Sequence, residues 1–194
     1  MANNMTEEKT VQPYEIGELD QYLFGNGTHY ELYKKMGAHL VTVDGVKGVY
    51  FAVWAPHAKS VSVIGEFNEW DLNADMMQRH DPMGIYTKFV PGAKEGQLYK
   101  FCIETQNGAK IDKADPFANY AELRPGNASR ITDISNLKWS DSSWMKKREK
   151  WDEKTNPMSI YEVHMGSWMR HPGREDEGFY TYREFAERIT EYVK

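Results

Sequence analysis

Residues 63–71, which read VIGEFNEWD, place an aromatic ring beside hydrogen-bonding side chains. Apolar residues open this stretch and suit a core, whereas Trp70 closes it directly after Asn68 and Glu69. A flat indole can stack on the C–H face of a pyranose ring while the neighbouring polar groups bind its hydroxyls. Covering ~80 Å² of apolar sugar face in this way is worth roughly 2 kcal/mol. The pattern therefore predicts that Trp70 stacks on a sugar; the alternative is that its ring packs under its own loop.

Other patterns that could support catalysis or metal binding are weak. Glycosyl transfer needs two carboxyl groups held on opposite sides of the reacting bond. Asp112 and Asp115 lie in a turn-like KIDKADP segment, and we interpret both as solvated turn residues. The six His residues show no metal-ligand spacing, and Cys102, the single cysteine, lies in a strand-like run. We expect no metal ion and no cofactor.

Composition narrows the class of partner. The net charge is −5 over 194 residues, and no face rich in Lys and Arg stands out, which argues against nucleic acid. The chain has no apolar run approaching the ~20 residues of a membrane span. Its first residues are polar and do not resemble a signal peptide. We therefore expect no membrane association and a cytoplasmic location.

The central part of the chain predicts a mainly β fold, an immunoglobulin-like β-sandwich over residues 20–137. Short apolar or alternating runs separated by Gly, Pro and Asp are typical of such sandwiches. Trp54 is interpreted as a core residue. We expect a flexible leader over 1–19. Inside the 20–137 domain, ahead of its first strand, we expect a helix that Thr28 and Glu31 cap and Gly37 ends. The expected strands cover residues 46–54, 60–64, 85–90, 97–104 and 129–134.

The residue composition changes after the sandwich. Residues 138–157 are charged and Trp-rich, and we interpret them as a linker. The apolar run 159–163 (SIYEV) then predicts a strand buried in a parallel sheet. Thr181 and Glu184 form a second capping-box pattern, and Phe185, Ile189 and Val193 follow on one helical face. Residues 158–194 thus predict one strand followed by one helix.

Several motifs together resemble the glycogen-binding module, carbohydrate-binding module family 48, that stands at the front of 1,4-α-glucan branching enzymes. They are VIGEFNEWD, GIYTKFVPG at 84–92, QLYKFCIE at 97–104, KADPFA at 113–118 and RPGNASRI at 124–131. The segment IYEVHMGSWMRH at 160–171 resembles the first strand and loop of the glycoside hydrolase family 13 barrel of these enzymes. The stretch YLFGNGTHYELYKKMGAHL is also similar to bacterial branching enzymes.

The resemblance implies roles for individual residues. Trp70 matches a sugar-stacking Trp, with Asn68 beside it, and Lys100 matches a Lys that hydrogen-bonds glucose hydroxyls. Asn127 and Ser129 fall where the last polar contacts of the module lie. One feature departs from the family: the stretch 106–110 offers no second stacking Trp. This departure favours a module that guides glucan to its barrel over one that binds tightly by itself.

The same resemblance implies that these residues do not catalyse glycosyl transfer. Family 13 enzymes that branch glucan cleave an α-1,4 bond through a covalent glycosyl intermediate and transfer the piece to a 6-hydroxyl. Their catalytic carboxylates come from later strands of a (β/α)₈ barrel of about 250 residues, and residues 158–194 match only its incomplete first β/α unit. His164 then lies at the barrel entrance, in a positioning role. We expect no catalytic residue here, and we expect the missing barrel strands to be a partner.

The expected activity is therefore binding of α-1,4/α-1,6-glucan, such as glycogen or maltooligosaccharides. Two alternatives remain: a stand-alone glucan-binding or scaffold protein, and the same region of a debranching or trehalose-forming family 13 enzyme. The run 159–163 and the apolar stripe of the last helix would pack back on the sandwich, pair with another chain, or stay mobile.

Overall fold

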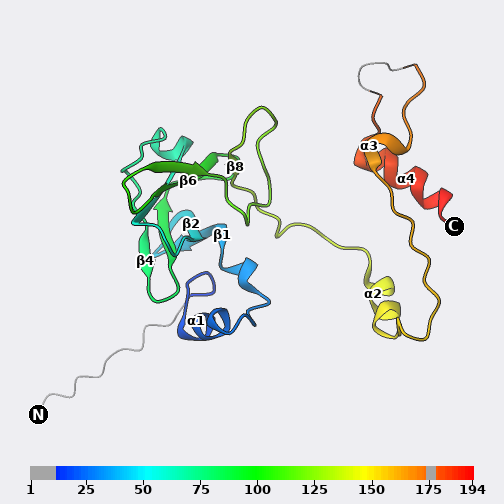
Figure 1. The fold of residues 1–194 in the computed structure, drawn as a ribbon, viewed down its shortest axis with the longest axis horizontal. Coiled ribbons are helices and arrows are strands. Elements are labelled where there is room, and N and C mark those ends of the chain that lie inside the picture. Colours follow the sequence, from blue (N-terminus) through cyan, green and yellow to red (C-terminus); the bar gives the residue numbers. More distant parts are fainter. Residues whose placement is uncertain (1–11, 174–177) are drawn as a thin grey trace, which may run out of the picture. The chain divides into compact units, whose positions relative to one another are not determined.

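The computed structural model describes residues 12–173 and 178–194, drawn as a ribbon in Figure 1. By contacts between residues the chain divides into two units, Met1–Leu137 and Lys138–Lys194. Each unit has its own architecture and is described separately below.

The first unit contains two antiparallel sheets, which confirms the prediction of a mainly β fold. One sheet has the order β1-β2-β5-β4, built from β1 (Gly37–Val43), β2 (Val46–Trp54), β5 (Ile85–Pro91) and β4 (Gln78–His80). The other has the order β3-β6-β7, built from β3 (Ser60–Gly65), β6 (Leu98–Glu104) and β7 (Lys110–Lys113), and β8 (Ser129–Arg130) also pairs with β6.

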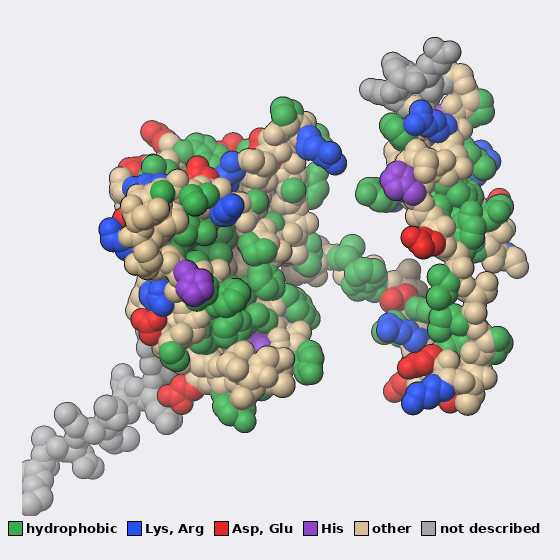
Figure 2. All heavy atoms as spheres, in the orientation of Figure 1, with side chains coloured by type: hydrophobic (Ala, Val, Ile, Leu, Met, Phe, Trp, Pro, Cys, Tyr) green, Lys and Arg blue, Asp and Glu red, His purple; other side chains and the backbone are tan. Residues whose placement is uncertain are grey.

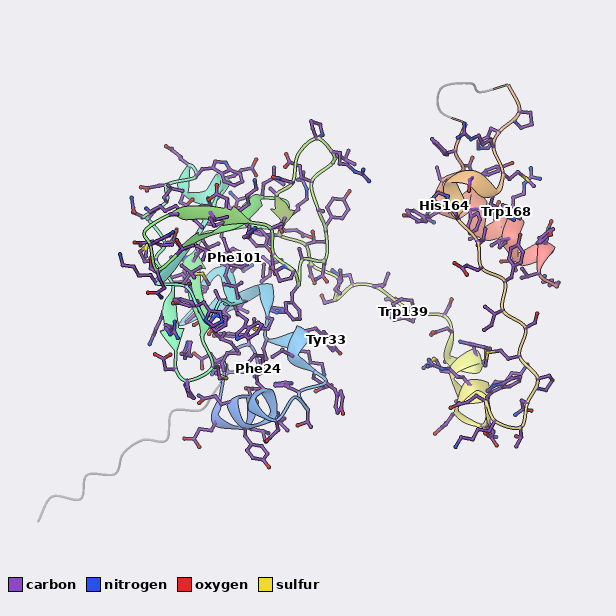
Figure 3. All side chains as sticks on the ribbon, viewed as in Figure 1. Phe24, Tyr33, Phe101, Trp139, His164 and Trp168 are labelled. Carbon is purple, nitrogen blue, oxygen red and sulfur yellow. The ribbon has the colours of Figure 1, made fainter. Side chains whose placement is uncertain are left out.

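The main core consists of the inward-facing side chains of both sheets. Val61 and Val63 alternate with Ser60 and Ser62 along β3, and both valines are fully buried. Tyr99 and Phe101 do the same along β6, and the ring of Tyr99 lies 5.1 Å from that of Phe51 in β2. Phe101 is labelled in Figure 3, within the sandwich. Because side chains alternate along a strand, Val61 with Val63 and Tyr99 with Phe101 share the inner face of their sheet.

A second apolar cluster lies on the opposite face of the first sheet. It joins Tyr50, Ala52 and Ile85 of the sheet to Ile16 and Met36. Tyr14 packs its ring 5.0 Å from that of Tyr50. Tyr14 and Ile16 belong to the stretch 1–19 that was expected to be a loose leader. Instead, Tyr14 and Ile16 pack on the sheet, because their apolar side chains cover strand residues that would otherwise face water. Residues 1–11 lie outside the described part.

The helix expected from Thr28 to Gly37 does not form. Helix α1 covers Glu18–Gly25 instead, and a short 3₁₀ turn follows at Leu32–Lys34. The Thr28 hydroxyl donates to the Leu23 carbonyl at 3.4 Å, so it does not cap a helix. Gly37 starts β1 with φ +98°, and a Cβ there would approach the Cβ of Phe117 to 3.2 Å. Gly37 is therefore required by tertiary packing rather than by a helix end.

Trp54 is not a core residue, contrary to expectation. It is the last residue of β2, and 54% of it is exposed. Its indole N–H donates to the Met83 carbonyl at 2.9 Å, and its ring meets Phe24 of α1 edge-on at 5.9 Å. Figure 3 shows Phe24 between α1 and the sandwich. Trp54 thus helps to hold α1 against the sheet.

The second unit contains three helices among its described residues: α2 (Ser142–Glu149), α3 (Met165–Trp168) and α4 (Tyr182–Tyr192). Helix α4 confirms the helix predicted from the capping box. The Thr181 hydroxyl accepts the Glu184 N–H, and the Glu184 carboxylate accepts the Thr181 N–H at 2.8 Å. The Thr181 N–H and the Thr181 hydroxyl both donate to the Glu184 carboxylate, and they lower its pKa from 4.5 to about 2.

The strand predicted at 159–163 does not form. No residue of this run takes part in a ladder among the described residues, and Ile160 is 83% exposed. A strand exists only where a neighbour pairs with its backbone groups, and none does so here. The described part of the chain also contains no helix long and apolar enough to cross a membrane.

Candidate functional site

A tight turn at the end of β3 positions Trp70. The turn passes through the 3₁₀ segment Glu66–Asn68, and the Trp70 N–H returns to the Gly65 carbonyl at 2.9 Å. Asn68 closes it from inside: its Oδ1 accepts the Gly65 N–H at 2.9 Å, while its Nδ2 donates to the Val63 carbonyl at 3.0 Å and to Asp75 at 2.8 Å. These hydrogen bonds occupy both amide N–H groups, so Asn68 shapes the turn.

The backbone of this turn is strained. Glu69 and Trp70 have φ of +54° and +62°, in the left-handed region that non-glycine residues rarely adopt. Each such residue costs on the order of 1 kcal/mol. Trp70 is 37% exposed, so its indole is partly covered by the protein and partly open to solvent. The hydrogen bonds of Asn68 offset the strain and hold the indole in this half-open position.

Lys100 lies beside the same turn on the outer face of the second sheet. It pairs across strands with Ile64, one residue before Gly65, the start of the turn. Because Tyr99 and Phe101 point into the core, Lys100 between them points outward. Glu66 connects the turn to β6, since its carboxylate accepts the Leu98 N–H at 2.9 Å. The structure therefore brings Trp70 and Lys100 to the same end of one sheet.

The two remaining sandwich residues differ in exposure. Asn127 is exposed in the loop that precedes β8, on the other side of β6 from the Trp70 turn. Ser129 is only 1% exposed, and its hydroxyl accepts the Asp115 N–H at 2.8 Å. Ser129 pairs with the inward-facing Tyr99, so its side chain also points inward. This burial corrects the expectation that Ser129 offers a polar contact to a sugar.

Asp115 is buried rather than solvated, which corrects the interpretation of the KIDKADP segment. Its carboxylate accepts the Tyr99 hydroxyl at 2.6 Å and the Phe117 N–H at 2.8 Å. Burial raises the pKa of Asp115 above 3.8, and burial together with the Asp115 charge raises the pKa of Tyr99. Asp112 is exposed on β7. The buried Tyr99–Asp115–Ser129 network anchors the loop before β8 and is closed to a substrate.

His164 belongs to the second unit, where it is exposed and precedes α3. Its Nδ1 lies 3.0 Å from the Ser167 hydroxyl, and its carbonyl accepts the Trp168 N–H at 3.0 Å. Among the described residues, no group of three or more His, Cys, Asp or Glu could hold a metal ion. Cys102 is free and buried.

The region that contains the Trp70 turn matches a known family. Residues 35–118 match the family model of carbohydrate-binding module 48 (isoamylase N-terminal domain). This range includes Asn68, Trp70 and Lys100, whereas Asn127, Ser129 and His164 lie beyond it. The half-exposed indole and the outward Lys100 therefore belong to a segment similar to carbohydrate-binding modules.

Curated relatives extend the similarity over most of the chain. A 1,4-alpha-glucan branching enzyme of Butyrivibrio fibrisolvens is 57% identical over 179 residues, which cover 92% of this chain and 28% of that protein. The enzyme of the same name from Rhodopirellula baltica is 49% identical over 190 residues, 96% of this chain and 26% of that protein. The chain thus spans little more than a quarter of the length of these relatives.

Solved structures show a weaker likeness. A pullulanase from Bacillus acidopullulyticus is 24% identical with a TM-score of 0.42, over 51% of this chain and 12% of that one. At this level, the likeness adds nothing to the sequence matches.

Proposed function

We propose that the chain is the N-terminal, glucan-binding part of a 1,4-α-glucan branching enzyme. The names of its relatives and the family match of residues 35–118 support this proposal. Branching activity is proposed only for a whole protein of the relatives' length, and for these residues we propose binding. The two curated relatives described above are both named branching enzymes, which favours this proposal over a debranching or trehalose-forming enzyme. We also propose a cytoplasmic location.

One observation carries the binding proposal: the half-exposed indole of Trp70 is held by a turn that is closed before any ligand arrives. The open part of the ring can cover the apolar face of a glucose unit. Lys100 supplies three ammonium donors to its hydroxyls, and Asn127 can contribute from the far side of β6. One stacked ring worth roughly 2 kcal/mol and a few exposed hydrogen bonds give a dissociation constant in the range of about 0.1–1 mM.

A calorimetric or NMR titration with maltoheptaose tests this proposal. We expect saturable binding by the 194-residue chain and at least a tenfold loss in Trp70→Ala, which corresponds to about 1.4 kcal/mol. Trp139→Ala is the matched control, because Trp139 is also exposed but lies outside the sandwich unit (Figure 3). If the folded chain shows no saturable binding at millimolar maltoheptaose, the proposal is wrong.

Lys100 gives a second, independent variant. Lys100→Met keeps the aliphatic stem and removes the ammonium donors, so we expect roughly a fivefold loss of affinity with unchanged stability, equivalent to about 1 kcal/mol. An unchanged affinity would remove Lys100 from the site without affecting Trp70.

We further propose that residues 158–194 begin a family 13 barrel in the whole protein. The formation of α4 and the motif at 160–171 support this assignment. Segment 159–163 would become a strand only when a neighbouring barrel strand pairs with it, and His164 would then lie at the barrel entrance. Amide exchange of residues 159–163, measured in this chain and in a whole protein that contains it, tests this proposal. Equal exchange in both would contradict it.

A further inference from the structure

The loop before β8 presents an exposed aromatic ring, that of Tyr120. The loop returns alongside β8: the Arg130 N–H donates to the Tyr120 carbonyl at 2.9 Å, and Ala121 bridges to Ser129. Tyr120 itself is 53% exposed. Its backbone is therefore fixed to the second sheet while much of its side chain faces solvent.

Tyr120 lines a shallow hollow of about 420 Å³ that combines an aromatic ring with charged groups. The Arg130 guanidinium lies 6.0 Å from the centroid of the Tyr120 ring and donates Nη1–H to the Gly96 carbonyl. Among the described residues it makes no other hydrogen bond, which leaves further N–H donors of its five. Glu95 accepts the Asp133 N–H through Oε1 at 3.1 Å. The remaining lining residues are Leu123, Ile131 and Thr132.

This hollow lies on the same sheet face as Lys100. Arg130 pairs directly with Leu98, which is two residues before Lys100 on β6, so the three side chains share the outer face. Pairing also defines a row from the Trp70 turn to the Tyr120 loop: Gly65 pairs with Tyr99, Tyr99 with Ser129, and Ser129 with Ala121. Three strand spacings of ~4.8 Å separate the ends of this row by roughly 14 Å.

We propose that Tyr120 is a second sugar-stacking residue, and that the hollow beside it is a distal subsite for the same α-glucan chain that Trp70 holds. The chemistry suits a pyranose, because the Tyr120 face and Leu123 meet its apolar side while Arg130 and Glu95 meet its hydroxyls. The ring comes from the loop before β8, so it can replace the stacking residue that the stretch 106–110 lacks. This inference rests on the proposed glucan binding.

The spacing of the two loops along this row makes the inference testable by ligand length. Maltose does not span roughly 14 Å and maltoheptaose does. NMR titrations of the full chain should therefore show Tyr120→Ala weakening maltoheptaose about tenfold (about 1.4 kcal/mol) while leaving the affinity of the Trp70 site for maltose within about twofold. Tyr120→Phe keeps the ring and should bind maltoheptaose like the unchanged chain. Tyr30→Ala, which removes an exposed ring from the segment before the 3₁₀ turn Leu32–Lys34, is the matched control and should have no effect.

The other possible results separate the distal subsite from the glucan-binding proposal. If Trp70→Ala removes binding but Tyr120→Ala binds maltoheptaose normally, the distal subsite is wrong and the glucan-binding proposal stands. If Tyr120→Ala weakens maltose and maltoheptaose equally, Tyr120 does not form a separate subsite. If the folded chain binds neither sugar, the glucan-binding proposal fails and the distal subsite fails with it.

Discussion

Two short apolar segments behave differently. Strand β5 of the sandwich unit forms a strand, whereas the run 159–163 of the second unit does not. β5 pairs with β2 on one side and β4 on the other, and most of its residues are buried or half-buried. The run 159–163 pairs with no described residue. Yet α4, in the same unit as that run, forms as the sequence predicts. A helix satisfies its backbone groups internally, whereas a strand depends on a neighbour.

The second unit is held by a small set of aromatic contacts instead of a layered core. Trp168 meets Phe185 at 5.4 Å and Tyr192 at 5.6 Å, and its indole N–H donates to the Tyr161 hydroxyl at 2.8 Å. Among the residues that the structure describes, the large side chains that are fully buried all belong to the sandwich unit. Figure 2 shows hydrophobic side chains exposed on the visible surface of both units. We therefore expect the two units to differ in stability and to respond separately to substitutions.

The largest effect should come from Phe51→Ala. Phe51 is fully buried, with its ring 5.1 Å from Tyr99 and 5.5 Å from Phe67. Its removal should cost about 3–5 kcal/mol, a large part of the stability of a small domain. Urea denaturation should show this loss, while the NMR signals of α4 stay in place. Phe179→Ala, at an exposed Phe of the second unit, is the control. Loss of the α4 signals together with the sandwich would mean that the units fold as one.

A smaller effect is expected from Asn68→Ala. The substitution leaves the Val63 carbonyl and the Gly65 N–H without their partner and releases the strained turn, at a cost of about 2 kcal/mol. It should also weaken maltoheptaose binding, because the indole is no longer held. Urea denaturation and a sugar titration measure both losses. Asn127→Ala, at an exposed Asn, should leave stability unchanged. A fully stable Asn68→Ala variant would contradict the role assigned to this amide.

Thr181→Ala should affect only the second unit. Loss of the hydroxyl that accepts the Glu184 N–H should cost α4 about 1 kcal/mol, visible as reduced helical chemical shifts in its first turn. The sandwich signals should not move. Thr190→Ala is an opposite control, because the Thr190 hydroxyl donates to the Ala186 carbonyl within the helix and Ala favours the helix more strongly. It should raise the helicity of α4.

The buried Asp115 carboxyl should make the free energy of unfolding depend on pH. Burial raises its pKa in the folded state, so the folded chain holds this proton more tightly than the unfolded chain. The contribution of Asp115 to stability therefore falls as the pH rises from 3.8 through its folded pKa. We would measure urea denaturation midpoints across this pH range. The fall in stability that Asp115 causes should be absent from Asp115→Asn.

Tyr99→Phe sharpens this test. The Tyr99 hydroxyl donates to the Asp115 carboxylate and thereby lowers the pKa of Asp115, so its removal should raise that pKa further. The fall of stability with pH should then be larger in total and extend to higher pH than in the unchanged chain. An identical slope in all three proteins would show that Asp115 keeps its ordinary pKa.

The sequence predicted the strands with a clear apolar or alternating pattern and missed those that tertiary contacts create. The runs at 46–54, 60–64, 85–90 and 97–104 are strands, and that at 129–134 shortens to Ser129–Arg130. The short or weakly patterned strands β1, β4 and β7 were not predicted. Helix α1 was missed because Gly17, not Ser or Thr, precedes it; the Gly17 N–H donates to Asp20 at 2.8 Å.

The candidate site was predicted in part. The partial exposure of Trp70 could be predicted because an aromatic residue among polar neighbours after a strand is unusual in a core, and 37% of the residue is exposed. The internal role of Asn68 could have been read from Asn three residues after a glycine, a common side chain-to-backbone turn. The burial of Ser129 and Asp115 could not, because both depend on contacts with Tyr99 across the sheet.

The closed turn that carries Trp70 has a kinetic consequence. A ring already in place needs no loop ordering on arrival, so a glucan meets it at the ordinary association rate for preformed sites, about 10⁵–10⁷ M⁻¹s⁻¹. With a dissociation constant of about 0.1 mM, each contact then lasts roughly 1–100 ms. On the proposed glucan binding, the sandwich would release a glucan branch many times per second, and would therefore sample successive segments of a polymer instead of anchoring to one.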